Sequence, residues 1–329
     1  MGEKADITQA RPVRLLAAGG TISMQGEHAV PTLDAAGLMA AIPELERFRD
    51  LTAENVLGLP GPQISLDQGL GLIRQAVVAA AHGEGVVITT GTDTLEELAM
   101  LCALLHDGAA PIVLTGANRP ASAPGADGPA NLLDAVALAA APAAADLGAV
   151  VVFGGEILGA ATARKVESTG PSAFAAPVAG PIGRVVEGRV WLSARPLRYP
   201  ALDPATIGYA VPIAIASLGE PGDALRAAAR SADGLVVEAF GAGHLTPGML
   251  HALRDAVARV PVVVTVAPER GSMMHATYGF EGSERDVRSS GAVCAPFLSA
   301  RAARIALLCC LGARLDRDAI ASALAPWDA

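Results

Sequence analysis

Three stretches of the chain combine hydroxyl, carboxylate and amine side chains in a way that could support chemistry on a carbonyl. Thr21 follows two glycines in A-A-G-G-T-I-S, Thr92 and Asp93 lie in V-I-T-T-G-T-D-T-L-E-E-L, and Lys165 lies in L-G-A-A-T-A-R-K-V-E-S-T-G-P. A threonine hydroxyl is a weak nucleophile until a neighbouring base accepts its proton. Lys165 is one of only two lysines in the sequence, and a lysine, unlike an arginine, can serve as such a base. These residue types point to acyl transfer from an amide or ester.

Thr92, Asp93 and Lys165 have complementary roles in such a reaction. We expect Lys165 to activate Thr92, directly or through a water molecule, while Asp93 orients the amine and holds its ammonium form. Attack on a carbonyl carbon produces an oxyanion, which backbone N–H groups can stabilise. Gly91 and Ala117 are the predicted donors, because each lies in or beside a glycine turn.

Each stretch also has a purely structural interpretation. Thr21 can simply bond to its own backbone at a strand-ending turn, although Gly20 would let the backbone approach a ligand closely. Asp93 or Thr94 can be the N-cap of the following helix, with one glutamate of L-E-E-L completing a capping box. A single lysine is usually solvated. Helix capping would explain one polar side chain of V-I-T-T-G-T-D-T-L-E-E-L and would leave the other hydroxyl and carboxylate groups without a structural role.

The overall composition excludes several classes of protein. Hydrophobic residues make up 52% and charged residues 17% of the 329 residues, so the chain can bury a large interior and is expected to form two domains. The net charge of −9 argues against a nucleic-acid partner, whose phosphates require a basic face. The four cysteines show no C-x-x-C and no metal-like spacing, which favours free thiols in a reducing cytoplasm.

The sequence predicts no membrane segment. Its N-terminus, M-G-E-K-A-D-I-T-Q-A-R-P, lacks the apolar stretch of a signal peptide. Apolar runs such as 305–312 are too short to span a bilayer. We therefore expect a soluble, cytoplasmic protein with no membrane partner.

Short apolar runs alternate with longer alanine-rich stretches, which is typical of a mainly parallel sheet with helices on both faces. In the first half the predicted strands are Val13–Ala18, Gly85–Thr90, Pro111–Thr115 and Ala149–Phe153, and the predicted helices are Leu66–Ala81, Leu95–His106 and Ala130–Ala140. In the second half the predicted strands are Ile213–Ser217, Gly234–Ala239, Pro261–Val266 and Ala292–Cys294, and the predicted helices are Leu225–Arg230, Pro247–Arg259, Ala300–Leu311 and Arg317–Leu324. The predicted fold class is α/β, with a larger N-terminal, doubly wound sheet and a smaller C-terminal α/β domain.

A proline-rich segment separates the two halves. Residues 195–212 carry four prolines and no hydrophobic periodicity, which is typical of an interdomain linker. We predict an N-terminal domain over 1–195, a linker over 196–212 and a C-terminal domain over 213–329. Ligands of such sheets bind in the loops beyond the carboxyl ends of the strands, where the three polar stretches lie.

Six segments spread along nearly the whole chain carry a family resemblance. They are A-A-G-G-T-I-S, T-T-G-T-D-T-L-E-E, V-L-T-G-A-N-R-P, G-A-D-G-P-A-N-L, Lys165 with the following S-A-F-A-A-P, and G-A-G-H-L-T-P. In these segments and their order the chain resembles the bacterial-type L-asparaginase/glutaminase family. The resemblance implies hydrolysis of a side-chain amide to a carboxylate and ammonia, without a metal or cofactor. It also implies a homotetramer of intimate dimers, with each site between the N-terminal domain of one subunit and the C-terminal domain of its partner.

The resemblance also assigns roles to the residues of the polar stretches. Thr21 resembles the family's primary nucleophile, and Thr92, Asp93 and Lys165 resemble its second Thr–Asp–Lys group. Asp93 would also meet the amino group of an amino-acid substrate. The two backbone donors predicted above fall where the family supplies backbone contacts to the substrate.

The loop after Thr21 departs from the family. The family has a tyrosine there, poised to assist the first threonine, whereas residues 23–36 contain none. What activates Thr21 is therefore an open question, and His28 is a candidate within the loop.

The residues that would recognise an amino-acid substrate differ as well. The family's G-S-Q segment, which grips the α-carboxylate, is matched by Gly61, Pro62 and Gln63, and proline offers neither a hydroxyl nor an N–H. Gln63 or Ser65 would have to substitute. His244 stands where the family has a partner-subunit asparagine, and the acidic residue that often precedes K-Y-G-F is absent from G-S-M-M-H-A-T-Y-G-F.

L-Asparagine is the expected substrate, and a different small amide or lactam is the alternative because the recognition residues differ. A second alternative is the ammonia-generating subunit of a tRNA-dependent amidotransferase. Such subunits carry an extra N-terminal region, for which the residues before the first glycine pair leave little room. A nucleotide-binding domain fits poorly, because neither A-A-G-G-T-I nor G-A-G-H-L-T matches G-x-G-x-x-G and no Walker A lysine is present.

Overall fold

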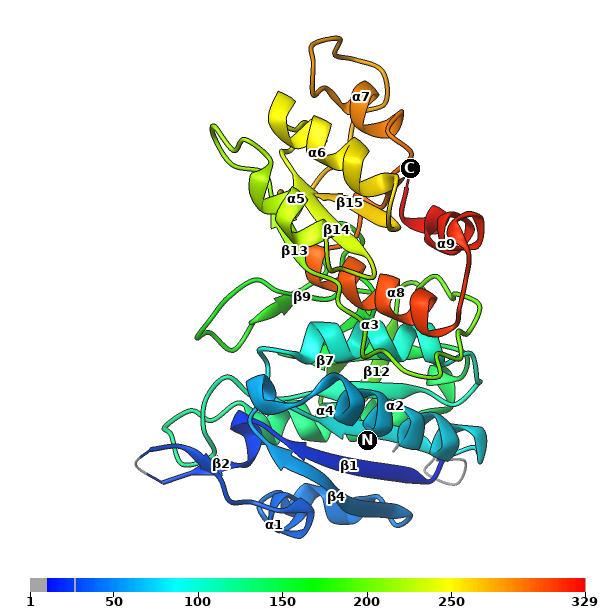
Figure 1. The fold of residues 1–329 in the computed structure, drawn as a ribbon. Coiled ribbons are helices and arrows are strands. Elements are labelled where there is room, and N and C mark those ends of the chain that lie inside the picture. Colours follow the sequence, from blue (N-terminus) through cyan, green and yellow to red (C-terminus); the bar gives the residue numbers. More distant parts are fainter. Residues whose placement is uncertain (1–10, 27, 329) are drawn as a thin grey trace. The chain divides into compact units, whose positions relative to one another are not determined.

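The computed structural model of this chain describes residues 11–26 and 28–328. The backbone divides into two compact units, Met1–Ala201 and Leu202–Ala329 (Figure 1). Each unit has its own parallel strands and its own helices. The division falls inside segment 196–212, which contains no helix or strand in the structure. The domain boundaries proposed from the sequence stay a prediction.

The described residues of the first unit form an eight-stranded sheet in the order β12-β11-β8-β7-β6-β5-β1-β4. Neighbouring strands from β4 to β7 are parallel, and those from β7 to β12 are antiparallel. The strands are β1 (Val13–Gly19), β4 (Leu51–Leu59), β5 (Gly85–Thr89), β6 (Ile112–Thr115), β7 (Ala149–Phe153), β8 (Glu156–Gly159), β11 (Gly183–Val186) and β12 (Arg189–Leu192). Outside this sheet, two short ribbons pair β2 (Met24–Gln25) with β3 (Val30–Pro31) and β9 (Arg164–Lys165) with β10 (Phe174–Ala175).

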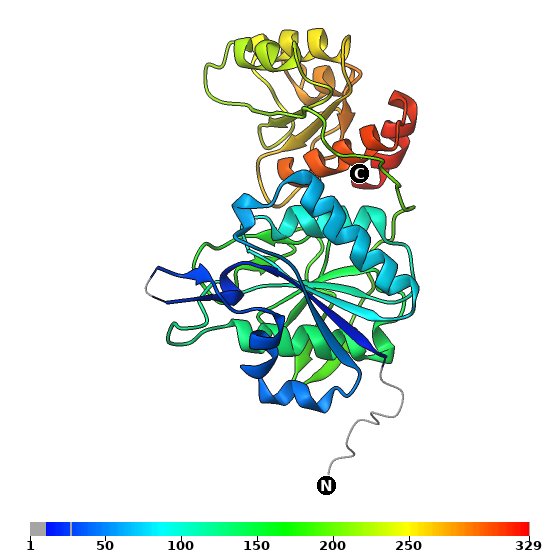
Figure 2. The same ribbon diagram turned by 60° about the horizontal axis from the view of Figure 1, so that its bottom comes forward.

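Helices cover both faces of this sheet (Figure 2). Helices α2 (Leu66–Ala81) and α3 (Leu95–Leu105) pack together on one face, and α1 (Ala35–Ala40) and α4 (Gly128–Ala140) lie on the other. Every residue of β5, β6 and β7 is buried, which explains their unbroken apolar runs. Because successive side chains of a strand point to opposite faces, Leu15 and Val87 join one core with Leu132 and Val136 of α4.

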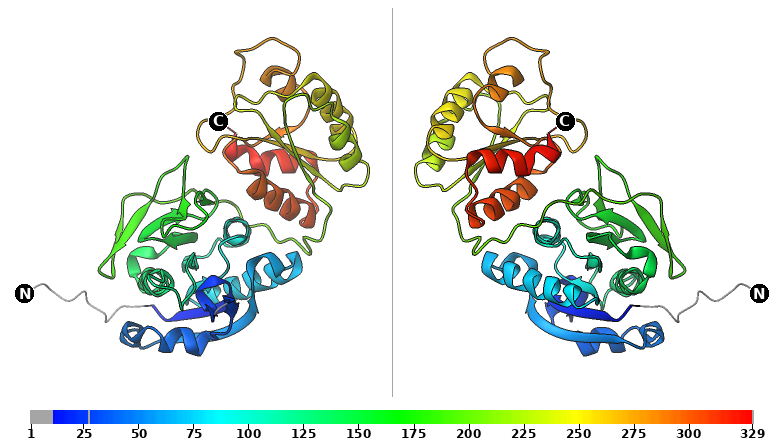
Figure 3. Two further views of the ribbon diagram at one scale, coloured as in Figure 1. Left: turned by 90° about the vertical axis from the view of Figure 1, so that its left-hand side faces the viewer. Right: turned by 90° about the vertical axis from the view of Figure 1, so that its right-hand side faces the viewer.

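The second unit contains a four-stranded parallel sheet in the order β13-β14-β15-β16, counted over its described residues (Figure 3). Its strands are β13 (Ile213–Ile215), β14 (Leu235–Ala239), β15 (Val262–Val266) and β16 (Val293–Cys294). Its helices are α5 (Asp223–Ala229), α6 (Pro247–Val257), α7 (Glu284–Arg288), α8 (Ala300–Gly312) and α9 (Arg317–Leu324). Helices α5 and α6 pack together over one face of the sheet, and α8 covers the other. Neither unit has, in its described part, a helix both long and apolar enough to cross a membrane.

The predicted fold class is confirmed, and β7, α2 and α9 have the predicted bounds. The sequence-based prediction missed β4, because its residues L-T-A-E-N-V-L-G-L mix polar with apolar side chains and are all half-buried or exposed. That pattern is typical of an edge strand, which is less covered than the strands at the centre of a sheet. The antiparallel strands β8, β11 and β12, which extend the opposite side of the sheet, were also not predicted.

His106, directly after α3, is a buried titratable residue of the first unit. Its side chain is 3% exposed, and its Nε2 lies 2.8 Å from the carbonyl oxygen of Ala110. Burial lowers the pKa of His106 below its ordinary value, because the charged ring would lose its hydration. The unfolded chain therefore binds a proton more readily than the folded protein, so protonation of this residue favours unfolding.

We expect the wild-type protein to lose stability relative to a His106→Gln variant as the pH falls from about 7.5 through about 6.5 toward 5. Glutamine keeps an N–H donor for Ala110 but does not titrate. Burial also raises the pKa of Asp134 to about 6, so protonation of this carboxyl stabilises the folded protein as the pH falls. Because this effect opposes that of His106 and is present in both proteins, the test compares the free energies of unfolding of the two proteins at each pH. Urea unfolding of both proteins across this range measures the difference, and a constant difference would contradict the expectation.

Candidate active site

The carboxyl ends of β1, β5 and β6 lie side by side at the same end of the first unit's sheet, because the three strands are parallel neighbours. This end of the sheet, and not its outermost strand, is the edge at which the candidate site lies. All three polar stretches of the sequence reach this edge. Two follow β1 and β5 directly, and the third supplies β9, which lies on the same side of the sheet as the β2–β3 ribbon (Figure 1). Open α/β sheets bind their ligands at this edge.

Three glycines bring the loops at this edge into backbone contact. Gly20 has a φ of 84°, and a Cβ atom there would overlap the backbone nitrogen of Gly91. A Cβ atom on Gly91 would in turn lie 2.7 Å from the backbone nitrogen of Gly61. Any side chain at Gly20 or Gly91 would therefore separate the loops. The structure thus places these three predicted substrate-binding residues side by side.

Lys165 meets Thr92 and Asp93 although 73 and 72 positions separate them along the chain. Its Nζ lies 2.8 Å from Thr92 Oγ1 and 2.7 Å from Asp93 Oδ1. Thr92 is only 6% exposed, whereas the side chain of Asp93 is 63% exposed and that of Lys165 is 18% exposed. The amine therefore bridges a buried hydroxyl and a carboxylate that faces solvent. The predicted Thr–Asp–Lys residues are together in space.

Helix capping does not account for the polar stretch that contains these residues. Helix α3 begins at Leu95 with Thr94 as its N-cap residue, but no side-chain capping bond forms there. The capping box considered from the sequence is absent. The Thr94 hydroxyl is buried and has no hydrogen-bond partner among the described residues. Asp93, the other candidate cap, is paired with Lys165 instead.

Thr21 begins a single 3₁₀ turn, Thr21–Ser23, directly after β1. Ser23 closes this turn, because both its backbone N–H and its hydroxyl donate to the carbonyl of Gly20, at 3.0 and 2.8 Å. Thr21 is half-buried, and its hydroxyl has no hydrogen-bond partner in the described part of the chain. His28, the candidate activator in the following loop, is exposed. The Thr21 hydroxyl is thus available for a ligand.

The two predicted oxyanion donors lie at the ends of adjacent strands. Gly91 follows β5 and Ala117 follows β6, and both residues are buried. Among the described residues neither backbone N–H has a hydrogen-bond acceptor. A Cβ atom on Gly116 would lie 3.6 Å from the methyl carbon of Thr92, so the Ala117 loop reaches the same hydroxyl-bearing residue.

Asp127 and Asn131 hold the loop after β6, and neither residue was assigned a role from the sequence. The Asp127 carboxylate accepts the backbone N–H groups of Asn118 and Arg119, at 3.0 and 2.8 Å. The Asn131 amide donates to the carbonyl of Gly116 at 3.0 Å and accepts the N–H of Gly154 at 3.0 Å. Asn131 is 2% exposed and so bridges the carboxyl ends of β6 and β7 from within the core. The segment G-A-D-G-P-A-N-L contains both side chains, which gives that motif a structural role.

Segment 61–63 forms a short 3₁₀ turn before α2. Pro62 and Gln63 are exposed, and Gly61 is buried against the Gly91 loop. Ser65, considered above as a substitute for the family's serine, is the N-cap of α2, and its hydroxyl accepts the N–H of Gln68 at 3.2 Å. The oxygen of this hydroxyl is therefore held at the helix cap, and the loop keeps the O–H donor of Ser65 as well as the side-chain amide of Gln63.

His244 belongs to the second unit, in the loop after β14. Its Nε2 lies 3.2 Å from Oε2 of Glu284, which is fully buried. The rings of Tyr278 and Phe280 meet the imidazole edge to face, at 4.8 and 4.9 Å between centroids. Burial opposes ionisation of Glu284, but N–H donors from Tyr278 and Thr277 and the His244 ring outweigh it and lower the pKa of this carboxyl. The sequence-based prediction missed Glu284 as the partner of His244.

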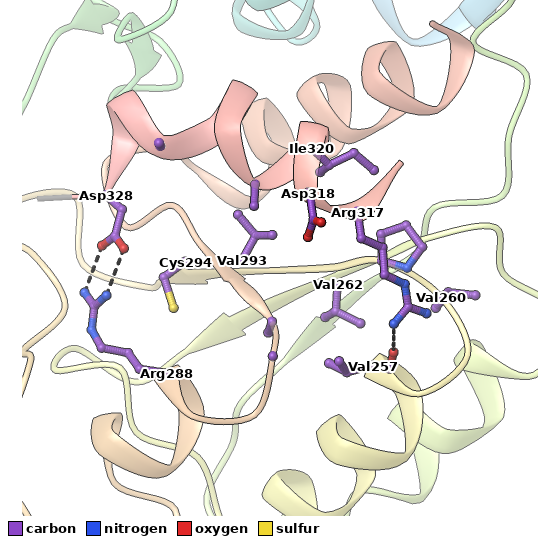
Figure 4. Close-up of a pocket in the computed structure, with 15 residues that line it drawn as sticks. Val257, Val260, Val262, Arg288, Val293, Cys294, Arg317, Asp318, Ile320 and Asp328 are labelled. Atoms are coloured by element: carbon purple, nitrogen blue, oxygen red, sulfur yellow. Dashed lines mark hydrogen bonds and ion pairs between the residues drawn. The ribbon is translucent and has the colours of Figure 1, made fainter. Parts of the chain in front are cut away.

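The second unit also has a groove of about 530 Å³ between β16, α9 and the end of α6 (Figure 4). Both arginines that line it are already paired: Arg288 binds Asp328 through two hydrogen bonds of 2.9 Å, and Arg317 donates to the carbonyl of Val257. Burial raises the pKa of the Cys294 thiol to about 11, so this cysteine is not a nucleophile at neutral pH. The described residues include no cluster of three or more His, Cys, Asp or Glu side chains that could hold a metal ion.

Comparisons with known proteins identify relatives of this chain along nearly its whole length. The family model described as "Asparaginase, N-terminal" matches residues 12–198, and the "Glutaminase/Asparaginase C-terminal domain" model matches residues 210–324. A probable L-asparaginase of Deinococcus radiodurans is 36% identical over 317 residues, which cover 93% of this chain and 94% of that protein. A probable periplasmic L-asparaginase of Haemophilus influenzae is 33% identical over 184 residues, 54% of this chain and 53% of that protein.

A solved structure supports the same assignment across both units. The probable cytoplasmic L-asparaginase of Campylobacter jejuni matches with a TM-score of 0.85 and 27% identity, over 96% of this chain and 99% of that one. The matching family models together span nearly the whole sequence, and they contain both the Thr–Asp–Lys cluster and His244. The chain therefore belongs to the asparaginase family of amidohydrolases.

Proposed function

We propose that this enzyme hydrolyses the side-chain amide of L-asparagine to L-aspartate and ammonia. The observation that carries the proposal is the position of Lys165, whose amine lies within hydrogen-bond distance of both Thr92 and Asp93. A buried hydroxyl beside an amine is the arrangement that proton transfer to and from a nucleophile requires. The family membership and the names of the relatives supply the substrate.

In the proposed reaction the hydroxyl oxygen of Thr21 attacks the amide carbon, and its proton passes to the leaving nitrogen. Ammonia departs and an ester to Thr21 remains. A water molecule then attacks this ester while its proton passes through the Thr92 hydroxyl to Lys165, and the carboxylate product leaves as Thr21 regains a proton. Asp93 accepts a hydrogen bond from the amine and so orients it through this cycle.

The backbone donors complete the proposed centre. The oxyanion formed in each half-reaction lies against the N–H groups of Gly91 and Ala117, which have no other acceptor among the described residues. Because these groups are fixed at the ends of two buried strands, little reorganisation is needed when the negative charge develops.

We propose that the substrate's amino and carboxylate groups are bound outside this centre. The exposed part of the Asp93 carboxylate suits the α-ammonium group. Gly20, Gly61 and Gln63 would line the other side, and His244 of a neighbouring chain would contact the substrate in a homo-oligomer. Sedimentation of the active enzyme tests the assembly, because full activity in a verified monomer would contradict it.

A different small amide or lactam is the second candidate substrate, and the observation that favours it is local. Pro62 has no N–H, and the Ser65 hydroxyl is held at the N-cap of α2, so this loop lacks one backbone donor and a freely oriented hydroxyl that could hold an α-carboxylate. An enzyme with the same proton-transfer residues but a weaker carboxylate site would accept amides without that group.

Ammonia release from a panel of amides tests the proposal and separates the two candidates. We expect equimolar ammonia and aspartate from L-asparagine at about 1 mM, a concentration near the upper range of enzyme KM values. Glutamine, D-asparagine, small primary amides and lactams complete the panel. Turnover of a lactam or simple amide without turnover of asparagine would establish the alternative, and no turnover of any amide would refute the proposed activity.

A cytoplasmic location is proposed as well. The C. jejuni neighbour is called cytoplasmic, whereas the H. influenzae relative is called periplasmic. All four cysteines are free and buried, which suits a reducing compartment. Fractionation of cells that express the untagged protein tests this location.

A further inference from the structure

Lys165 lies on a strand too short to hold its own position. Strand β9 contains only Arg164 and Lys165, which pair with Ala175 and Phe174 of β10. Isolated two-stranded ribbons are marginally stable even when they are much longer than this. The placement of the Lys165 amine within 2.8 Å of Thr92 therefore depends on contacts between this ribbon and the rest of the unit.

Glu96 supplies such a contact at Lys165 itself. The Oε2 atom of Glu96 accepts the backbone N–H of Lys165 at 3.0 Å, across 69 positions of the chain. Glu96 is 5% exposed and lies in the first turn of α3. Burial of a carboxyl group is costly unless it is hydrogen-bonded, so this contact must offset the loss of hydration. Thr92 and Asp93 lie just before α3, and Glu96 lies in its first turn. One short segment therefore contacts both the amine and the backbone N–H of Lys165.

Other contacts fasten the ribbon at other points. The ring of Phe174 packs on that of Phe153 with 5.0 Å between centroids, and the Asn118 amide donates to the carbonyl of Gly170 at 2.8 Å. These contacts hold β10 and the connecting loop. Loss of the Glu96 bond would therefore leave the ribbon attached while removing the bond that ties the Lys165 backbone to α3.

We propose that Glu96 is a positioning residue for Lys165, acting through the backbone of the lysine and not through its amine. The inference rests on the proposed function of Lys165 in proton transfer. A displacement of a reacting group by about 1 Å can reduce turnover about 100-fold. The contact requires only an acceptor oxygen on the side chain at position 96. A glutamine there should therefore keep the contact, and an apolar side chain should lose it.

Amide hydrogen exchange tests the contact without any use of enzymatic activity. NMR of the wild-type protein should show a protected Lys165 amide, which exchanges at least about 10-fold faster in Glu96→Met, a substitution of similar volume. The amide should stay protected in Glu96→Gln and in Lys165→Met, because both variants retain the backbone bond. An unprotected Lys165 amide in the wild-type protein would overturn the inference even if the Met variant fails to fold.

Steady-state kinetics test the consequence for catalysis. We expect Glu96→Met to lower kcat about 10- to 100-fold with KM changed less than about threefold, and Glu96→Gln to restore most of kcat. Glu97→Met is the matched control, because it makes the same substitution in the same helical turn and should leave kcat near the wild-type value. Unchanged kcat in Glu96→Met, or equal losses in the Met and Gln variants, would overturn the inference. A wild-type protein without amidase activity would instead refute the proposed function, and the exchange experiment would still decide whether Glu96 holds Lys165.

Discussion

Substitution of Lys165 by methionine is expected to lower kcat for amide hydrolysis by about 10² to 10⁴-fold, the usual contribution of a positioned acid or base. Methionine has a similar length but cannot exchange a proton with the Thr92 hydroxyl, 2.8 Å from the amine in the wild-type protein. The fold should tolerate the change, because the Asp93 carboxylate is 63% exposed and water screens its attraction to the amine, so the ion pair contributes little to stability. Initial rates of ammonia release, with thermal unfolding of the same samples, measure both effects.

Lys165→Arg separates proton transfer from simple electrostatic attraction. Arginine keeps the positive charge and can still pair with Asp93, but it does not release its proton at neutral pH. We therefore expect the arginine variant to be about as impaired as the methionine variant. Near-normal turnover in Lys165→Arg would show that the amine contributes only its charge, and near-normal turnover in Lys165→Met would show that the cluster is idle.

Thr92→Val is expected to cause a loss of kcat of similar size, about 10² to 10⁴-fold. Valine matches threonine in shape and fits a residue that is 6% exposed, so the change removes the hydroxyl and little else. Because Thr92 and Lys165 act on the same proton, the double variant should be scarcely slower than either single variant. Rates of the three variants under one set of conditions provide the test, and fully multiplicative losses would contradict a shared role.

Thr89→Val is the matched control for this experiment. Thr89 is the last residue of β5, is fully buried, and its hydroxyl has no hydrogen-bond partner among the described residues. The same chemical change there removes an unsatisfied polar atom, which should leave stability unchanged or slightly higher. A loss of turnover in Thr89→Val as large as that in Thr92→Val would mean that the strand, and not the Thr92 hydroxyl, is the sensitive element.

The sequence predicted the central strands well because burial on both faces leaves a plain signal. Residues 149–153, A-V-V-V-F, are entirely buried, and a short, unbroken run rich in valine is typical of a strand between two helical layers. Strand β4 lies at the edge of the sheet, where polar side chains are tolerated, and its mixed pattern concealed it. The β11–β12 hairpin turns through Glu187 and Gly188, both with positive φ. A glycine-containing turn between two short runs with valine predicts a hairpin, and the sequence-based prediction missed it.

The candidate site was predictable where residue chemistry was distinctive and not where position alone mattered. A scarce lysine and a cluster of hydroxyls pointed to Lys165 and Thr92, which the structure brings together. Glu96 was considered only as part of a cap, because an acidic residue in the first turn of a helix is common on electrostatic grounds. Its bond to a residue 69 positions away depends on the packing of the ribbon, which no local pattern reveals. Asn131 and its loop contacts were missed for the same reason.

A crystal structure of the Thr92→Val variant soaked with L-asparagine tests the central claim most directly. We expect the side-chain amide carbon within about 3.5 Å of the Thr21 hydroxyl, the distance of a near-attack geometry. The amide oxygen should face the N–H groups of Gly91 and Ala117, with Lys165 beside the amide. Asparagine bound elsewhere, for example in the groove beside Arg288, with the space around Thr21 and Lys165 empty, would contradict the account.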